Sequence, residues 1–95
     1  MGGAEIIEIE LKKSIWAGVK HLPYESRYSA AEKIFAAFDP AETLRAGVSR
    51  YALIMDAIQG IHTTFVPGNS GTYGRAVSLD TGDIVRDDRP WQMQV

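Results

Sequence analysis

The sequence contains no cysteine among its 95 residues. This absence excludes disulfide bonds, zinc sites built from thiolates and cysteine nucleophiles. A small domain without disulfides is typical of a reducing compartment, so the sequence predicts a cytoplasmic protein. No apolar run reaches the roughly 18 residues of a membrane span, and no cationic start precedes a hydrophobic stretch. The expectation is therefore a chain without a membrane segment or a signal peptide.

Histidine is also scarce, because His21 and His62 are the only two imidazoles. A metal site without cysteine would need both of them and a carboxylate, and their spacing matches no metal-ligand motif. The sequence therefore predicts no metal site and no bound cofactor. His62 follows Ile58 by four residues, which favours a structural histidine near the end of a helix.

No charge of one sign dominates the chain, whose formal net charge is −2. Residues 12–50 carry a mild excess of basic side chains. That excess is too small to predict a protein that binds a phosphate backbone, so nucleic acid is not the expected partner.

Length and composition are those of an ordinary small globular protein. Hydrophobic residues make up 45% and charged residues 23% of the chain. A chain of this size forms one compact domain, here residues 1–95, and its core is thin. A thin core favours the burial of additional surface against a partner.

The N-terminal segment AEIIEIEL alternates between apolar and acidic residues, which predicts a half-buried strand. Residues 15–22 are a candidate second strand, so the expectation is an N-terminal strand or hairpin. A helix competes with this interpretation because Ile7, Leu11 and Ile15 also share one helical face. Gly18 argues against the helix, since glycine is a poor helix former. Whether residues 12–22 form strand or helix stays open.

Two helix starts follow a loop with the sequence LPYESRY. A capping box that begins at Ser29 predicts a helix over residues 30–38. A second box begins at Asp39, with proline in the first helical position, and predicts a longer helix over residues 40–60. The long helix carries an apolar seam at intervals of three and four residues, formed by Ala41, Leu44, Val48, Tyr51, Met55 and Ile58. It is expected to be the spine of the fold.

The C-terminal third has the composition of antiparallel strands. HTTFV follows Gly60, and the segment GRAVSLDTGDIVRD predicts a hairpin whose tight turn contains Asp80 and Gly82. Pro90 interrupts the pattern, after which WQMQV is a candidate edge strand. The predicted fold class is therefore α+β, with the C-terminal hairpin and edge strand packed on the long helix.

Three glycines lie in the segment VPGNSGTYGR, at positions 68, 71 and 74. Neither the P-loop pattern nor the dinucleotide-binding pattern is present, and a strand follows where phosphate binding requires a helix. The preferred interpretation is a flexible loop over residues 68–74. Tyr73 and Arg75 at its end are candidate contacts for a partner.

No recognisable catalytic constellation is present, which favours a non-enzymatic protein. The sequence predicts a small binding or regulatory protein that acts through protein–protein contact as a homodimer. Aromatic side chains beside arginine are typical of binding hot spots, and the candidates are Tyr24, Arg27, Tyr28, Tyr73, Arg75 and Trp91.

Two alternative functions stay open. The two consecutive helices are compatible with a nucleic-acid-binding regulator. A small-ligand binder or enzyme would instead use a pocket between the long helix and the sheet, with Tyr51, Met55 and His62 as its candidate lining.

Overall fold

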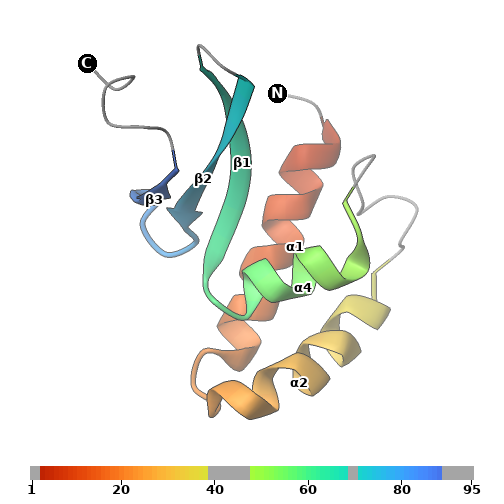
Figure 1. Ribbon diagram of the computed structural model, residues 1–95. Coiled ribbons are helices and arrows are strands. Elements are labelled where there is room, and N and C mark those ends of the chain that lie inside the picture. Colours follow the sequence, from red (N-terminus) through yellow and green to blue (C-terminus); the bar gives the residue numbers. More distant parts are fainter. Residues whose placement is uncertain (1–2, 39–47, 69–70, 89–95) are drawn as a thin grey trace.

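The computed structural model describes residues 3–38, 48–68 and 71–88. Helices α1 (Gly3–Val19), α2 (Tyr24–Ala36) and α4 (Arg50–Ala57) precede strands β1 (Ile61–Gly68), β2 (Gly71–Ser78) and β3 (Ile84–Asp87). The helices lie on one side of the molecule and the sheet on the other, joined where β1 meets α1 and α4 (Figure 1). This arrangement confirms the predicted α+β class.

The predicted N-terminal strand is wrong, because residues 3–19 form helix α1. The buried positions of this helix repeat at intervals of one, three or four residues, and they are Glu8, Leu11, Lys12, Ile15 and Val19. Ile6 and Ile7 remain exposed. The alternation of isoleucine and glutamate therefore does not describe the buried face, which includes two charged residues.

Gly18, which argued against a helix, lies at a close approach between α1 and α2. A Cβ atom at this position would lie 2.7 Å from Cδ1 of Ile34. Helix α1 ends at Val19, and the amide of Leu22 then donates to the carbonyl oxygen of Val19. Residues 12–22 are therefore helix and turn, not strand.

Helix α2 begins at Tyr24, directly after Pro23, which is its N-cap residue. The predicted start at Ser29 is wrong, and residues 24–28 of the segment predicted as a loop form the first part of this helix. The Pro23 ring restricts φ, here −54°, and the residue's ψ of 144° is extended, so the helix begins only after it. The candidate residues Tyr24, Arg27 and Tyr28 are consequently helical.

Helix α4 is shorter than the predicted helix over residues 40–60. It begins at Arg50, and the Ser49 side chain caps it by accepting a hydrogen bond from the amide of Ala52 at 3.0 Å. Ser49 itself is extended, with ψ 159°. A serine that caps a helix in this way ends any preceding helix, so residues 40–60 are not one continuous helix. The predicted cap at Asp39 lies outside the described residues.

The apolar core lies among the three helices. Its buried members are Leu11, Ile15 and Val19 of α1, Ala31 and Phe35 of α2, and Leu53, Ile54, Ala57 and Ile58 of α4 and its C-cap. The short α4 fills the angle between α1 and α2 (Figure 1). Within the described ranges, no helix combines the length and the apolar character that crossing a membrane requires.

The sheet is antiparallel with the strand order β1-β2-β3. The β2–β3 connection confirms the predicted hairpin, and Gly82 at its turn has a φ of +79°. Strands β1 and β2 pair from Ile61 opposite Ser78 to Gly68 opposite Gly71. Most of the predicted loop 68–74 is therefore regular strand. The candidate edge strand WQMQV lies outside the described residues.

Two contacts fix the β2–β3 turn, one to the α4–β1 turn and one to helix α1. The amide of Leu79 donates to the carbonyl oxygen of Gly60 at 2.8 Å. The indole Nε1 of Trp16 on α1 donates to Oδ1 of Asp80 at 2.9 Å. The sheet is thus held to the helical layer at the end where β1 begins.

Candidate functional site

Helix α1 buries two charged side chains, Glu8 and Lys12, each with 1% of its surface exposed. They lie one helical turn apart, and Lys12 Nζ is 2.9 Å from Glu8 Oε2. Glutamate and lysine are almost never fully buried unless they are paired. Within the described residues, buried charge is therefore concentrated around this pair.

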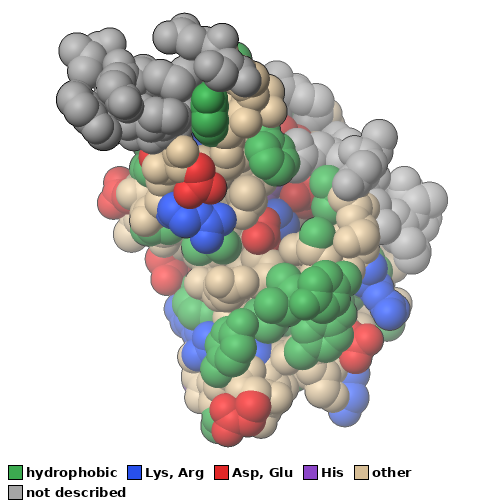
Figure 2. Space-filling model, viewed as in Figure 1, with side chains coloured by type: hydrophobic (Ala, Val, Ile, Leu, Met, Phe, Trp, Pro, Cys, Tyr) green, Lys and Arg blue, Asp and Glu red, His purple; other side chains and the backbone are tan. Residues whose placement is uncertain are grey.

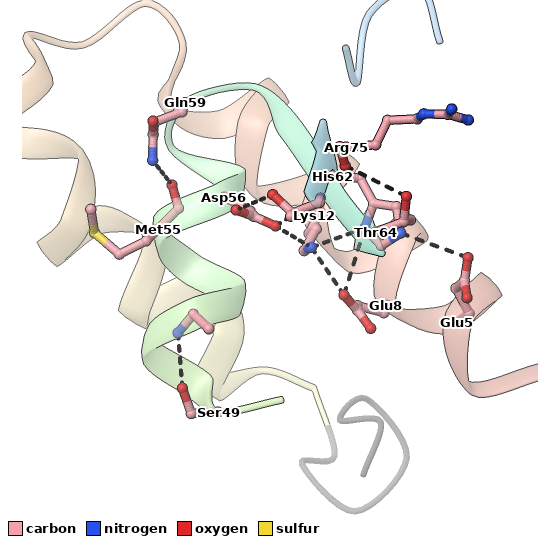
Figure 3. Close-up of polar contacts among 12 residues, drawn as sticks. Glu5, Glu8, Lys12, Ser49, Met55, Asp56, Gln59, His62, Thr64 and Arg75 are labelled. Carbon is pink, nitrogen blue, oxygen red and sulfur yellow. Dashed lines mark hydrogen bonds and ion pairs between the residues drawn. The ribbon is translucent and has the colours of Figure 1, made fainter. Parts of the chain in front are cut away.

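Lys12 Nζ has partners on three different elements (Figure 3). Besides Glu8, it contacts Oδ2 of Asp56 on α4 at 2.8 Å and Nδ1 of His62 on β1 at 2.9 Å. An ammonium group has three hydrogens to donate, and this geometry provides one acceptor for each. Glu8, Lys12, Asp56 and His62 are called the Lys12 cluster below.

The contact with Lys12 fixes the tautomer of His62, which is only 2% exposed. Because the ammonium donates, Nδ1 of the imidazole must accept, and the ring hydrogen then lies on Nε2. Nε2 is 3.8 Å from Oε1 of Glu5, a second carboxylate of α1. Figure 3 shows the ring between the two glutamates of α1.

Asp56 joins α4 to the beginning of β1. Its Oδ2 accepts from Lys12 and from the amide of Thr63 at 3.0 Å, while its Oδ1 accepts from the Thr63 hydroxyl at 3.1 Å. A carboxylate offers about four acceptor positions, so one remains on Oδ1. The Asp56 side chain is 19% exposed, in contrast to Glu8 and Lys12.

A pocket of about 280 Å³ opens beside the Lys12 cluster, between α1, α4 and β1. Its charged lining is formed by Glu8, Lys12 and Asp56, and the rest by Val48, Ala52, Thr63 and Phe65. Figure 2 shows acidic and basic side chains together between β1 and α4. Two acids oppose one base in this lining, so the pocket has a negative field.

The ammonium group of Lys12 is fully engaged within the Lys12 cluster. An ammonium that donates all three hydrogens has no lone pair for nucleophilic attack. Across the described ranges, no group of three or more histidine, aspartate or glutamate side chains is arranged to hold a metal ion. Lys12 itself supplies the positive charge between the carboxylates of Glu8 and Asp56.

The three residues predicted to line a pocket are not brought together. His62 belongs to the Lys12 cluster. Tyr51 is 62% exposed, and its ring lies 5.9 Å from that of Tyr28 on α2. Met55 packs against the apolar core. A helix–sheet pocket exists, but its lining differs from the predicted one.

Arg27 is used inside the fold. Its guanidinium donates to the carbonyl oxygens of Lys20, Leu22 and Ile58, each at 3.0 Å. The same group lies over the rings of Trp16 and Tyr24, at 5.3 and 5.7 Å from their centroids. Arg27 therefore connects the α1–α2 turn to the end of α4 and positions Tyr24.

The remaining predicted binding residues lie in the sheet or beyond it. Tyr73 and Arg75 are half-buried in β2, and Arg75 pairs with Asp87 of β3 at 3.4 Å. Trp91 lies outside the described residues.

Sequence reasoning missed Glu8, Lys12, Asp56 and Thr63. The signal for the first two was the spacing of a glutamate and a lysine by four residues, which places them together on a helix. That signal has meaning only once residues 3–19 are taken as helical. Asp56 lay off the apolar seam of α4, where a solvent-facing position was the natural interpretation.

Comparison of the chain with models of known protein families found no match. Comparisons with curated proteins and with solved structures found no match either.

Proposed function

We propose that this chain is a non-enzymatic binding protein that acts through protein–protein contact, and that it binds a second copy of itself. The observation that carries the proposal is an exposed aromatic surface on α2 and α4. It consists of Tyr24, Tyr28 and Tyr51 and is called the tyrosine surface below.

The tyrosine surface has the properties of a binding hot spot. Tyr24 and Tyr51 are 52% and 62% exposed, and Tyr28 supports the ring of Tyr51. Figure 2 shows hydrophobic side chains gathered over α4 and α2. Tyrosine supplies a large contact area with few rotatable bonds, and it is enriched where binding energy concentrates.

Charges beside the tyrosine surface favour a second copy as the partner. Arg50 of α4 and Glu32 of α2 are both well exposed, and their nearest charged atoms are 3.6 Å apart. Exposed pairs of this kind contribute little to the stability of a single chain. In a two-fold contact, Arg50 of one copy can face Glu32 of the other and the reverse, so the surface is self-complementary.

The Lys12 cluster supports the non-enzymatic part of the proposal. Its ammonium group has an acceptor for every hydrogen within the fold. Such a group stabilises the packing of α1, α4 and β1 and is not available to a substrate.

The test is a pair of charge reversals measured by light scattering over a range of concentrations. Arg50→Glu and Glu32→Arg should each weaken self-association, because each places like charges opposite one another in the two-fold contact. An equimolar mixture of the two variants should restore the dimer, since both cross-contacts are then complementary. Lys13→Glu, on an exposed position of α1, is the matched control and should leave association unchanged.

A wild-type chain that is monomeric at all concentrations would contradict the proposal. So would a mixture of the two variants that associates no better than either variant alone. Tyr51→Ala should weaken the dimer as well, because it removes the most exposed ring of the tyrosine surface.

A further inference from the structure

The pocket beside the Lys12 cluster has a chemistry that defines a ligand class. We propose that it binds an organic cation, namely a primary ammonium group carried on a short aliphatic chain. This inference is independent of self-association, because the pocket is built by α1, α4 and β1 without the tyrosine surface.

The first argument is charge. Glu8 and Asp56 supply two negative charges to the lining, and Lys12 supplies one positive charge. Lys12 Nζ is shared between Glu8 Oε2 at 2.9 Å and Asp56 Oδ2 at 2.8 Å, so one negative charge remains over the two carboxylates. Of the two, only the Asp56 carboxylate is partly exposed and can be reached from the pocket. A cation is therefore the ligand that this lining favours.

The second argument is the geometry of the free acceptor. Oδ2 of Asp56 already accepts two hydrogen bonds, whereas Oδ1 accepts one, from the Thr63 hydroxyl. A guanidinium group binds a carboxylate best through two parallel bonds, one to each oxygen. Since Oδ2 is occupied, a single bond to Oδ1 remains, and an ammonium group can satisfy it.

The third argument is the apolar part of the pocket lining. Val48, Ala52 and Phe65 are apolar, and Phe65 is 72% exposed. An aliphatic chain can lie against these side chains while its ammonium reaches Asp56. An aromatic face also attracts a cation. The volume of about 280 Å³ lies at the small end of ligand pockets, which suits one chain of a few carbons.

Such an ammonium can belong to a free amine or to the lysine side chain of a protein partner. Both sources present the same ammonium group, so the choice of probe must distinguish them. Butylammonium represents the free amine. A lysine blocked as its Nα-acetyl methylamide represents the side chain, and its Nε-acetylated form is the uncharged counterpart.

The experiment is a titration followed through the backbone amide signals of Ala52, Thr63 and Phe65 by nuclear magnetic resonance, at constant ionic strength. Butylammonium should shift these signals to saturation. The affinity for butanol should be lower by roughly tenfold or more, because butanol lacks the charge-assisted bond. Butyrate should not bind, because its carboxylate is repelled by that of Asp56. Butyrate or butanol shifting the signals as strongly as butylammonium would overturn the proposal, as would no saturable shift.

A variant that fills the pocket completes the test. Ala52 is exposed on α4 and lines the pocket, so Ala52→Leu should fold and should abolish the butylammonium shifts. Ala17→Leu makes the same change at an exposed position of α1 outside the lining and should preserve them. Unchanged binding by Ala52→Leu would overturn the proposal.

The blocked lysine and its Nε-acetylated form decide whether the bound ammonium group belongs to a lysine side chain or to a free amine. Binding of the blocked lysine, together with loss on Nε-acetylation, would assign the pocket to a lysine side chain. Binding of butylammonium alone would assign it to a free amine. Glu32→Arg, which should weaken self-association, lies outside the pocket lining and should retain the butylammonium shifts, so the two proposals fail separately.

Discussion

The ammonium nitrogen of Lys12 lies 2.9 Å from Nδ1 of His62, and both side chains are almost completely buried. The two residues are 50 positions apart in the chain, and their contact joins the first helix to the first strand. Burying an ammonium is costly unless every hydrogen finds an acceptor. The packing of α1, α4 and β1 therefore depends on the complete set of partners around Lys12.

Lys12→Met should destabilise the chain strongly. The substitution keeps an unbranched side chain but leaves the buried carboxylate of Glu8 without its ammonium partner, for which the expected loss is about 3–5 kcal/mol in the free energy of unfolding. Urea denaturation measures this loss. Lys13→Met is the matched control, because Lys13 is exposed on the neighbouring position of the same helix and should have little effect.

A double variant separates charge from packing. Lys12→Met combined with Glu8→Leu removes the buried negative charge together with its partner, so it should be less destabilised than Lys12→Met alone. Losses that simply add in the double variant would show that the unpaired carboxylate is not the cause.

His62 should be in the neutral form with its hydrogen on Nε2. Lys12 donates to Nδ1, so the nitrogen chemical shift of Nδ1 should be that of an unprotonated ring nitrogen. Long-range proton–nitrogen spectra near neutral pH measure both ring nitrogens. His21 is an internal control, because its exposed ring should exchange between tautomers. A hydrogen on Nδ1 of His62 would contradict the proposed geometry of the Lys12 cluster.

The β2–β3 hairpin was predictable from sequence because its signals are local, whereas the pairing of residues 71–74 with β1 was not, since these residues were predicted as part of a loop. The β2–β3 turn places Asp80 and Gly82 between two β-branched stretches, and these few residues determine the hairpin. The helical half was not predicted as well. Its boundaries depend on Pro23 and Ser49, which compete with the capping boxes that begin at Ser29 and Asp39.

The Lys12 cluster could not be predicted from patterns of neighbouring residues in the sequence. Lys12 and Asp56 are 44 positions apart, and nothing near either residue indicates the other. The alternation of isoleucine and glutamate in α1 also concealed the buried face, because the periodicity of apolar residues assumes that charge faces solvent. A glutamate and a lysine inside the fold violate that assumption, so the charged lining of the pocket beside them could not be foreseen.

Arg27→Lys should destabilise the chain although it preserves the charge. The guanidinium donates to three backbone carbonyl oxygens from the α1–α2 turn and from the end of α4, and an ammonium cannot reproduce this fork. Loss of two such bonds should cost about 1–3 kcal/mol in the free energy of unfolding. Arg50→Lys is the matched control, because Arg50 makes only an exposed ion pair among the described residues, and it should unfold at nearly the wild-type urea concentration.

Gly60→Ala should destabilise the junction between α4 and β1 more than Gly82→Ala destabilises the hairpin. Both glycines have positive φ, +73° and +79°, so alanine pays about 1–2 kcal/mol for the left-handed backbone at either position. At Gly82 no atom lies within 4 Å of the added methyl group, so the left-handed backbone is the only expected cost. At Gly60 the methyl group would lie 2.8 Å from Cε2 of Trp16, whose indole is held by Asp80.

A shift of the Trp16 ring away from Gly60 would disturb that hydrogen bond, so overpacking should add about 1–3 kcal/mol to the cost of the left-handed backbone. Urea denaturation of the two variants measures the difference directly, because both share the same backbone cost. If both variants lose the same free energy of unfolding, the Trp16 ring moves aside without cost. The contact between Trp16 and Gly60 then does not constrain the junction.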